Sequence, residues 1–232
     1  MVRVDAPSPG ETVESPLRVD GQARGGWFFE ANFPVTLLQE DGSVVAEHYA
    51  TAEGEWMTDQ FVPFSSEILF SHPGPGRGWL VIHRANPSGL SEQEEEVRIP
   101  VRFGDTETMD VVVHFSREGE ADCEETVAVP RVITRTDAPA RAALEHLLAG
   151  PTSTEREEGY FSAIPAGVSI QRLTLDGGTA EVDLSEQLEA GSGGACRAQA
   201  IRSQIENTLL HFPSVETVVI SVNGRVDDIL QP

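Results

Sequence analysis

Short apolar stretches recur along the first hundred residues and are separated by turn-forming sequences. They lie at residues 17–23, 34–39, 44–50, 56–62, 79–85 and 97–103. Six runs at this spacing, with no helical period, predict the strands of an all-β sandwich over residues 1–103. Asp41-Gly42 stands between two of the runs and predicts a hairpin, and Pro100 favours an edge position for the last strand.

The pattern changes between residues 103 and 107, where we place a domain boundary. Strands are expected at 111–115, 126–134, 168–175, 179–184 and within VETVVISVNG. Helices are expected in TDAPARAALEHLLAGP, with Asp137 as the cap, and in the segment that ends at Pro213. The second helix has one apolar face, made by Ala198, Ile201, Ile205, Thr208, Leu209 and Phe212. The order predicts an α+β domain over residues 108–232, with helices packed on a small sheet.

The charge balance of the chain narrows the possible partners. The 232 residues contain 38 acidic and 16 basic side chains, a formal net charge of −22, and every basic side chain is Arg. Both predicted domains are acidic, so neither is expected to be a basic nucleic-acid-binding domain. Such a surface repels phosphate backbones and anionic headgroups, so we expect no nucleic-acid binding and no polybasic docking to membranes.

No apolar run approaches the roughly 18 residues of a membrane span, and MVRVDAPSPG does not have the pattern of a signal peptide. Either the protein is cytosolic, or an export signal or lipid anchor lies outside this sequence. The cysteines bear on this choice.

The residues that carry chemistry do not form a recognisable catalytic or metal-binding motif. The six histidines occur without H-x-H or H-x-x-x-H spacing, and no C-x-x-C, G-x-S-x-G, S-x-x-K or calcium-loop pattern occurs. Glu157-Glu158 beside Tyr160 are better explained as a solvated helix end than as an acid/base pair. GSGGA before the second helix lacks the spacing and the lysine of a Walker loop. We therefore assign no catalytic residue, no metal ligand and no cofactor.

Trp27-Phe28-Phe29, with Phe33, could form an aromatic binding patch. Successive residues on a strand point to opposite faces, so at least one of the first three is expected in the core. The core interpretation is preferred.

Cys123 and Cys196 are the two cysteines of the chain, and both lie in the second predicted domain. The alternatives are a disulfide, two inert thiols, or a reactive Cys196 at the start of a helix. Two cysteines in one domain, with no third, favour a disulfide between Cys123 and Cys196. Closing a loop of about 70 residues would stabilise the domain by roughly 4 kcal/mol in the chain-entropy model. Such a bridge belongs in an oxidising compartment.

The second domain closely resembles the GerMN domain of sporulation and spore-germination proteins. The likeness rests on ALEHLLAGPT, EREEGYFSAIP, the DGG hairpin leading into VDLS, and AQAIRSQIENTLLHFP before VVISV. Residues 1–103 are similar to the immunoglobulin-like domain that accompanies GerMN in some bacterial proteins. FEANF, ATAEGEW and GWLVIHRANPSG carry this weaker likeness, and ANPSG departs from the acidic turn expected there.

The resemblance implies an extracytoplasmic envelope protein, membrane-anchored outside this sequence, without known catalysis. It offers no catalytic residues to carry over. We therefore expect a structural or protein-interaction module whose partners are other envelope proteins. The alternatives are a ligand-binding module for glycan, peptidoglycan or a small molecule, and an enzyme that uses Cys196 or a carboxylate pair.

Overall fold

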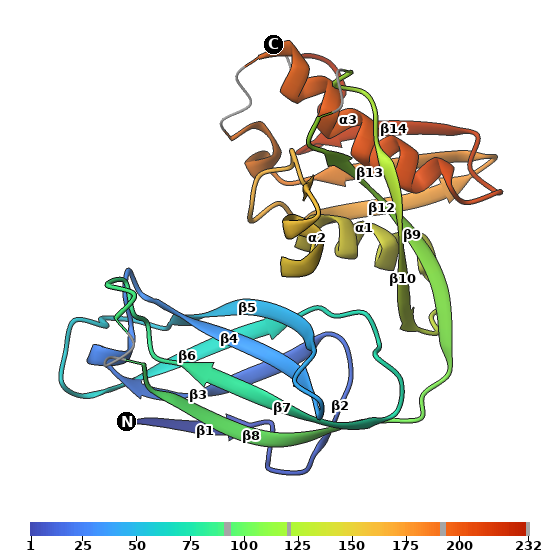
Figure 1. Cartoon of the computed structure of the whole chain (residues 1–232). Helices are drawn as coiled ribbons and strands as arrows, with labels where there is room; N and C mark the ends of the chain where they lie inside the picture. The colour runs from blue at the N-terminus through green and yellow to red at the C-terminus, as the bar shows by residue number, and fades with distance from the viewer. Residues whose placement is uncertain (91–93, 120–121, 191–193, 231–232) are drawn as a thin grey trace. The chain divides into compact units, whose positions relative to one another are not determined.

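The structure, a computed structural model, describes residues 1–90, 94–119, 122–190 and 194–230 (Figure 1). The chain is mostly β with few helices, and it forms two compact units, Met1–Thr108 (unit 1) and Met109–Pro232 (unit 2). Unit 2 begins within β9, close to the change of pattern seen in the sequence. That the two units are separately folding domains stays a prediction.

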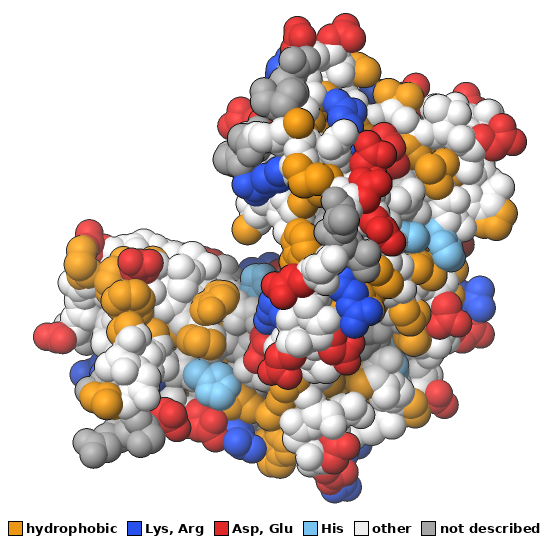
Figure 2. Space-filling model, turned by 45° about the horizontal axis from the view of Figure 1, so that its top comes forward, with side chains coloured by type: hydrophobic (Ala, Val, Ile, Leu, Met, Phe, Trp, Pro, Cys, Tyr) orange, Lys and Arg blue, Asp and Glu red, His pale blue; other side chains and the backbone are white. Residues whose placement is uncertain are grey.

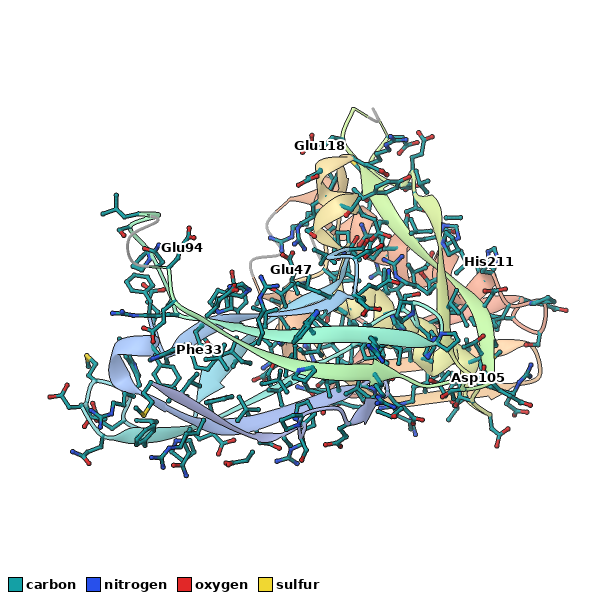
Figure 3. The ribbon with its side chains drawn as sticks, turned by 60° about the horizontal axis from the view of Figure 1, so that its bottom comes forward. Phe33, Glu47, Glu94, Asp105, Glu118 and His211 are labelled. Atoms are coloured by element: carbon teal, nitrogen blue, oxygen red, sulfur yellow. A yellow bond between two sulfur atoms is a disulfide. The ribbon has the colours of Figure 1, made fainter. Side chains whose placement is uncertain are left out.

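Unit 1 is a curled sheet of eight strands in the order β1-β3-β6-β5-β4-β7-β8-β2. The strands are β1 Val2–Ala6, β2 Thr12–Val13, β3 Leu17–Arg24, β4 Asn32–Gln39, β5 Val44–Ala52, β6 Phe61–Ile68, β7 Gly76–His83 and β8 Glu96–Phe103. An all-β sandwich was expected, and the pairs Thr51–Ser65 and Ala52–Phe64 between β5 and β6 join its strands into one curled sheet. Alternate side chains face inward and form one apolar core, in which Phe33, labelled in Figure 3, is fully buried.

Two local predictions for unit 1 have different outcomes. Asp41-Gly42 forms the turn between β4 and β5, as expected, with Gly42 at φ 90° and the Ser43 amide donating to the Asp41 carboxylate. The expected strand at 56–62 is wrong, because β6 begins only at Phe61 and continues to Ile68. The inward alternation of Phe64, Ser66 and Ile68 sets the strand there, while Met57 stands in an exposed loop.

In the described part of unit 2 there are two three-stranded sheets, where one small sheet was expected. The first has the order β10-β9-β11 and the second β12-β13-β14. The strands are β9 Thr108–Arg117, β10 Val127–Thr134, β11 Tyr160–Phe161, β12 Ile170–Asp176, β13 Thr179–Leu184 and β14 Thr217–Val222. β13 pairs antiparallel with β12 and parallel with β14.

Within its described residues, unit 2 also has three α-helices: α1 Pro139–Ala149, α2 Ser153–Glu157 and α3 Ala195–Leu210. The apolar faces of α1 and α3 share one core with side chains of both sheets, among them Phe115, Leu144, Val182 and Ile201. The expected cap at Asp137 is wrong. The first turn begins one residue later, after Ala138, whose amide is bonded to the Thr136 hydroxyl.

Candidate functional site

A disulfide joins Cys123 to Cys196 at the start of α3, with 5.2 Å between the Cα atoms. It ties the acidic loop after β9, near Glu118 in Figure 3, to the first turn of the helix. The bond removes the free thiol that a reactive Cys196 would need. Gly194 caps the helix at φ 106°, a conformation that favours glycine, while Gly191 and Gly193 of the GSGGA sequence lie outside the described residues.

The acidic loop meets the next turns of α3 through a carboxylate and an amide. The Gln199 side chain donates to Glu124 at 3.2 Å. Burial raises the pKa of Glu206, about two helical turns farther along α3, Arg202 opposes the rise, and the charge of Glu124 adds to it. The Glu124 carboxylate therefore lies beside the early turns of α3, where it disfavours the binding of an anion.

The middle of α3 carries a fully buried polar side chain, Gln204. Its amide nitrogen donates to the Ser116 hydroxyl at 2.8 Å and to the Phe161 carbonyl at 3.2 Å. Its oxygen accepts the Ala163 amide at 3.1 Å and the Ser162 hydroxyl at 3.3 Å. These four bonds use the whole hydrogen-bonding capacity of the amide and fix α3 to β9 and β11. Gln204 therefore has no group left for a ligand.

A second buried polar cluster links β10 to α2. Arg131 donates to both carboxylate oxygens of Glu155 at 2.6 and 2.7 Å, and its side chain is 6 % exposed. Glu155 also completes a capping box with Thr152. Burial alone would raise the pKa of Glu155, but its bonds to Arg131 and Thr152 lower it. The same burial lowers the pKa of nearby His146 to about 4, with the charge of Arg131 adding to the effect.

Two histidines meet at the far end of α3. The rings of His114 and His211 lie 5.8 Å apart, and His211, labelled in Figure 3, is exposed. Burial, and then the charge of His211, lower the pKa of His114, whose Nδ1 is bonded to the Thr126 hydroxyl. Across the described residues, no group of three or more His, Cys, Asp or Glu side chains could hold a metal ion.

The remaining site candidates from the sequence, the aromatic patch and Glu157-Glu158, all lie within the described residues. Trp27, Phe28 and Phe33 are buried in the core of unit 1 and Phe29 is exposed, so the four residues form no aromatic patch. Glu157 ends α2 and Glu158 follows it as the C-cap, both exposed. The sequence reasoning missed Arg131, Glu155 and Gln204, although T-x-x-E at 152–155 is a capping-box signature that could have indicated α2.

The sheet β12-β13-β14 presents an unprotected edge at β12. Within the described chain, β12 pairs with β13 and with no strand on its other side. A register shift at Ile170–Arg172 and an Arg141 bond to the Ile170 carbonyl cover the start of the strand. From Leu173 to Asp176 no such protection exists among the described contacts, and Leu175 is 50 % exposed.

The family model described as "Sporulation and spore germination", Germane, matches residues 112–228, about half of the chain. The protein belongs to the Germane family. A second family model, Gmad2, described as an immunoglobulin-like domain of bacterial spore germination, matches residues 1–91. The Germane match spans the disulfide, both buried polar clusters and the β12 edge.

Solved structures with similar chains are also known. The tandem GerMN domains of the sporulation protein GerM from Bacillus subtilis are 21% identical, with a TM-score of 0.42, over 52% of this chain and 41% of that chain. The first GerMN domain of the same protein is 19% identical, with a TM-score of 0.39, over 51% and 85%. A putative lipoprotein from Clostridium perfringens is 15% identical, with a TM-score of 0.35, over 51% and 76%.

The chain thus spans less than half of the first of these structures. No curated protein matches the chain. Within the described part of the chain, no helix has the length and apolar character needed to cross a membrane.

Proposed function

We propose that this protein is a non-catalytic, extracytoplasmic module of the bacterial cell envelope that binds other envelope proteins. The observation that carries the proposal is the open edge of β12, because an exposed strand can add a strand from a partner through main-chain hydrogen bonds. In this proposal the two units are separate domains, and expressing 1–104 and 105–232 apart tests that division.

The other strand edges of unit 2 are less suited to strand addition. β10 contains Pro130, which has no amide hydrogen to donate, and β11 has only two residues. β14 is the second edge of its sheet, but Val218 and Val219 on it are partly buried, whereas Leu175 on β12 is half exposed. Leu173–Asp176 is therefore the segment best suited to pairing.

The charge around this segment favours a basic partner. On the outer face of the sheet Glu181 lies opposite Thr174, and Asp183 lies opposite Arg172. Figure 2 shows that acidic side chains far outnumber basic ones on the visible surface. A partner strand with alternating apolar and basic residues would complement both the edge and its charge, whereas nucleic acid and anionic liposomes would be repelled.

The disulfide supports a location outside the cytoplasm, because such bonds persist in oxidising compartments and are rare in the cytosol. The family description, sporulation and spore germination, is consistent with an envelope role. In this proposal the membrane is reached only through a signal or anchor outside this sequence.

A photo-crosslinking residue at Thr174, in the full chain expressed in its own cells, tests the proposal. We expect covalent capture of an envelope protein, reduced by Leu175→Lys because a lysine on the edge opposes strand pairing. Leu210→Lys is the matched control, since Leu210 is a 42 % exposed leucine of the same unit on α3. Equal loss in both variants, or no capture at all, contradicts the proposal. Hydrolytic turnover that a single substitution abolishes would contradict its non-catalytic part.

A further inference from the structure

Unit 1 contains a groove of about 350 Å³ on the outer face of β7 and β8, which lie side by side in Figure 1. Its floor is made by β7 and β8, one wall by Pro9-Gly10, and the other by Glu40. Backbone hydrogen bonds fix both walls: the Gly10 amide donates to the Pro100 carbonyl, and the Glu40 amide donates to the Arg77 carbonyl. The volume is near the lower end of the range of ligand pockets, about 300–1,000 Å³, and suits one small group.

Four side chains form a square on the floor. Trp79 lies directly opposite Pro100, and Arg77 lies directly opposite Arg102, two residues farther along the same face. The lining is mostly apolar apart from the charged side chains. A flat, partly buried indole is therefore placed beside two guanidinium groups.

The two arginines are unusual in so acidic a protein. Like charges directly opposite on neighbouring strands are destabilising, yet Arg77 and Arg102 are two of the 16 basic residues in a chain of net charge −22. Among the described residues, Arg77 lies 3.9 Å from the carboxylate of Glu40, and the side chains of Arg77 and Glu40 are both largely exposed. Arg102 forms no ion pair within the described residues. An anion between the two guanidinium groups would relieve this repulsion.

We propose that the groove binds a sugar ring that carries a carboxylate or a phosphate. The C–H face of a pyranose packs on the Trp79 indole, the anionic group accepts charge-assisted bonds from Arg77 and Arg102, and the sugar hydroxyls donate to Glu40. This inference goes beyond the proposed protein-interaction role and does not depend on it, since it concerns a different unit.

An extended peptide fits the groove less well, because the backbone around it is already paired. The two floor strands bond to each other, and the free side of β8 is occupied by the bonds of Pro100 to Gly10 and of Arg102 to Glu11. A ligand must therefore be recognised by side chains alone. One flat ring flanked by charged groups is an arrangement suited to a charged sugar.

Nuclear magnetic resonance titration of the full chain tests the proposal. Trp79→Phe identifies which of the three indole N–H signals belongs to Trp79. Galacturonic acid and glucose 6-phosphate represent the carboxylate and phosphate classes, neutral galactose and glucose their uncharged counterparts, and acetyl-Pro-Glu-Pro-amide a peptide. We expect one or both acidic sugars to shift the Trp79 signal, with a dissociation constant at least about tenfold lower than that of the neutral sugar.

Arg77→Gln and Arg102→Gln should each weaken acidic-sugar binding at least about fivefold, because each removes a charge-assisted bond. Arg98→Gln is the matched control: Arg98 is exposed on the same face of β8, is paired with Glu96, and does not line the groove. Binding of only one acidic sugar identifies the anionic group. The proposal is overturned if no acidic sugar shifts Trp79, if neutral sugar or peptide binds equally well, or if Arg98→Gln weakens binding as much as Arg102→Gln.

Discussion

The cores of the two units differ in how many polar side chains they bury. Among the described residues, the buried polar side chains of unit 1 are Ser66 and His72, and the rest of its interior is apolar. Unit 2 buries Ser116, Arg131, His146, Ser185, Gln204 and Thr208, and adds a disulfide. Apolar packing is non-directional, whereas a buried polar pair works only in one geometry. The stability of unit 1 should therefore be sensitive to changes in side-chain shape. The stability of unit 2 should be sensitive to changes in charge, pH and redox state.

The largest expected difference concerns the disulfide. Replacing Cys123 and Cys196 by Ser should lower the free energy of unfolding of unit 2 by up to about 4 kcal/mol, since the bond spans 73 residues. The apolar core of α1, α3 and the sheets should keep the unit folded. Hydrogen exchange of the full chain, followed separately at core amides of β7 and β13, measures both units at once. Equal destabilisation of the two units would refute the contrast.

The buried ion pair gives the next effect. Arg131→Met leaves the Glu155 carboxylate partly buried without its bidentate partner and should destabilise unit 2 by about 3 kcal/mol. Arg141→Met is the control, because Arg141 forms an exposed i,i+4 pair with Glu145 and should cost no more than about 0.5 kcal/mol. Urea denaturation of the two variants compares them. Similar losses would mean that the burial of Arg131 is unimportant.

Shape is the sensitive property of unit 1. A Cβ on Gly25 would lie 2.1 Å from the Thr58 carbonyl oxygen and 2.2 Å from that of Trp56, so the loops would have to separate. Gly25→Ala should destabilise unit 1 by about 2 kcal/mol and leave unit 2 unchanged. Gly26→Ala is a neighbouring control, since its Cβ would meet nothing within 4 Å. Thermal unfolding compares the pair, and equal melting temperatures would show that the close approach is not needed.

The last effect, of similar size, is the response to pH. Because burial and Arg131 lower the pKa of His146 from 6.5 to about 4, the unfolded chain binds a proton between these values that the folded chain does not. Stability is therefore lost as the pH falls from about 6.5 toward 4, by about 2 kcal/mol between pH 7.5 and pH 5. Hydrogen exchange at both pH values should show this loss at β13 and not at β7. His146→Leu should reduce the loss, and an unchanged pH response would exclude His146 as its source.

The hydrophobic pattern predicted most elements because each face is set locally. The alternation in β3, β7 and β8 and the apolar face of α3 were visible without any long-range information. The pairing of β5 with β6, and the second sheet of unit 2, depend on which strands meet, and no local signal encodes that. The prediction of a strand at 56–62 was wrong because Trp56 and Phe61 are equally typical of strands in the sequence. The conformation of the loop before β6 depends instead on the close approach of Gly25 to the Trp56 and Thr58 carbonyl groups.

The site residues also divide into those that the sequence indicated and those that it did not. Cysteine counting indicated the Cys123–Cys196 bridge, since a chain with two cysteines offers one intrachain pairing. The sequence did not indicate Arg131, Glu155 and Gln204, because nothing in it distinguishes an isolated polar residue that is buried from one that is exposed. Trp79, Arg77 and Arg102 were missed because the register of β7 and β8, not their spacing along the chain, places them on one surface.

The central proposal is that unit 2 is an oxidised module of the cell envelope. The most direct test is alkylation of the protein in intact cells, followed by mass spectrometry of Cys123 and Cys196 with and without reductant. The account predicts no label on either cysteine until reductant is added, because both sulfurs are joined in the folded protein. Two freely labelled thiols in the native, folded protein would contradict it and would restore Cys196 as a possible reactive group.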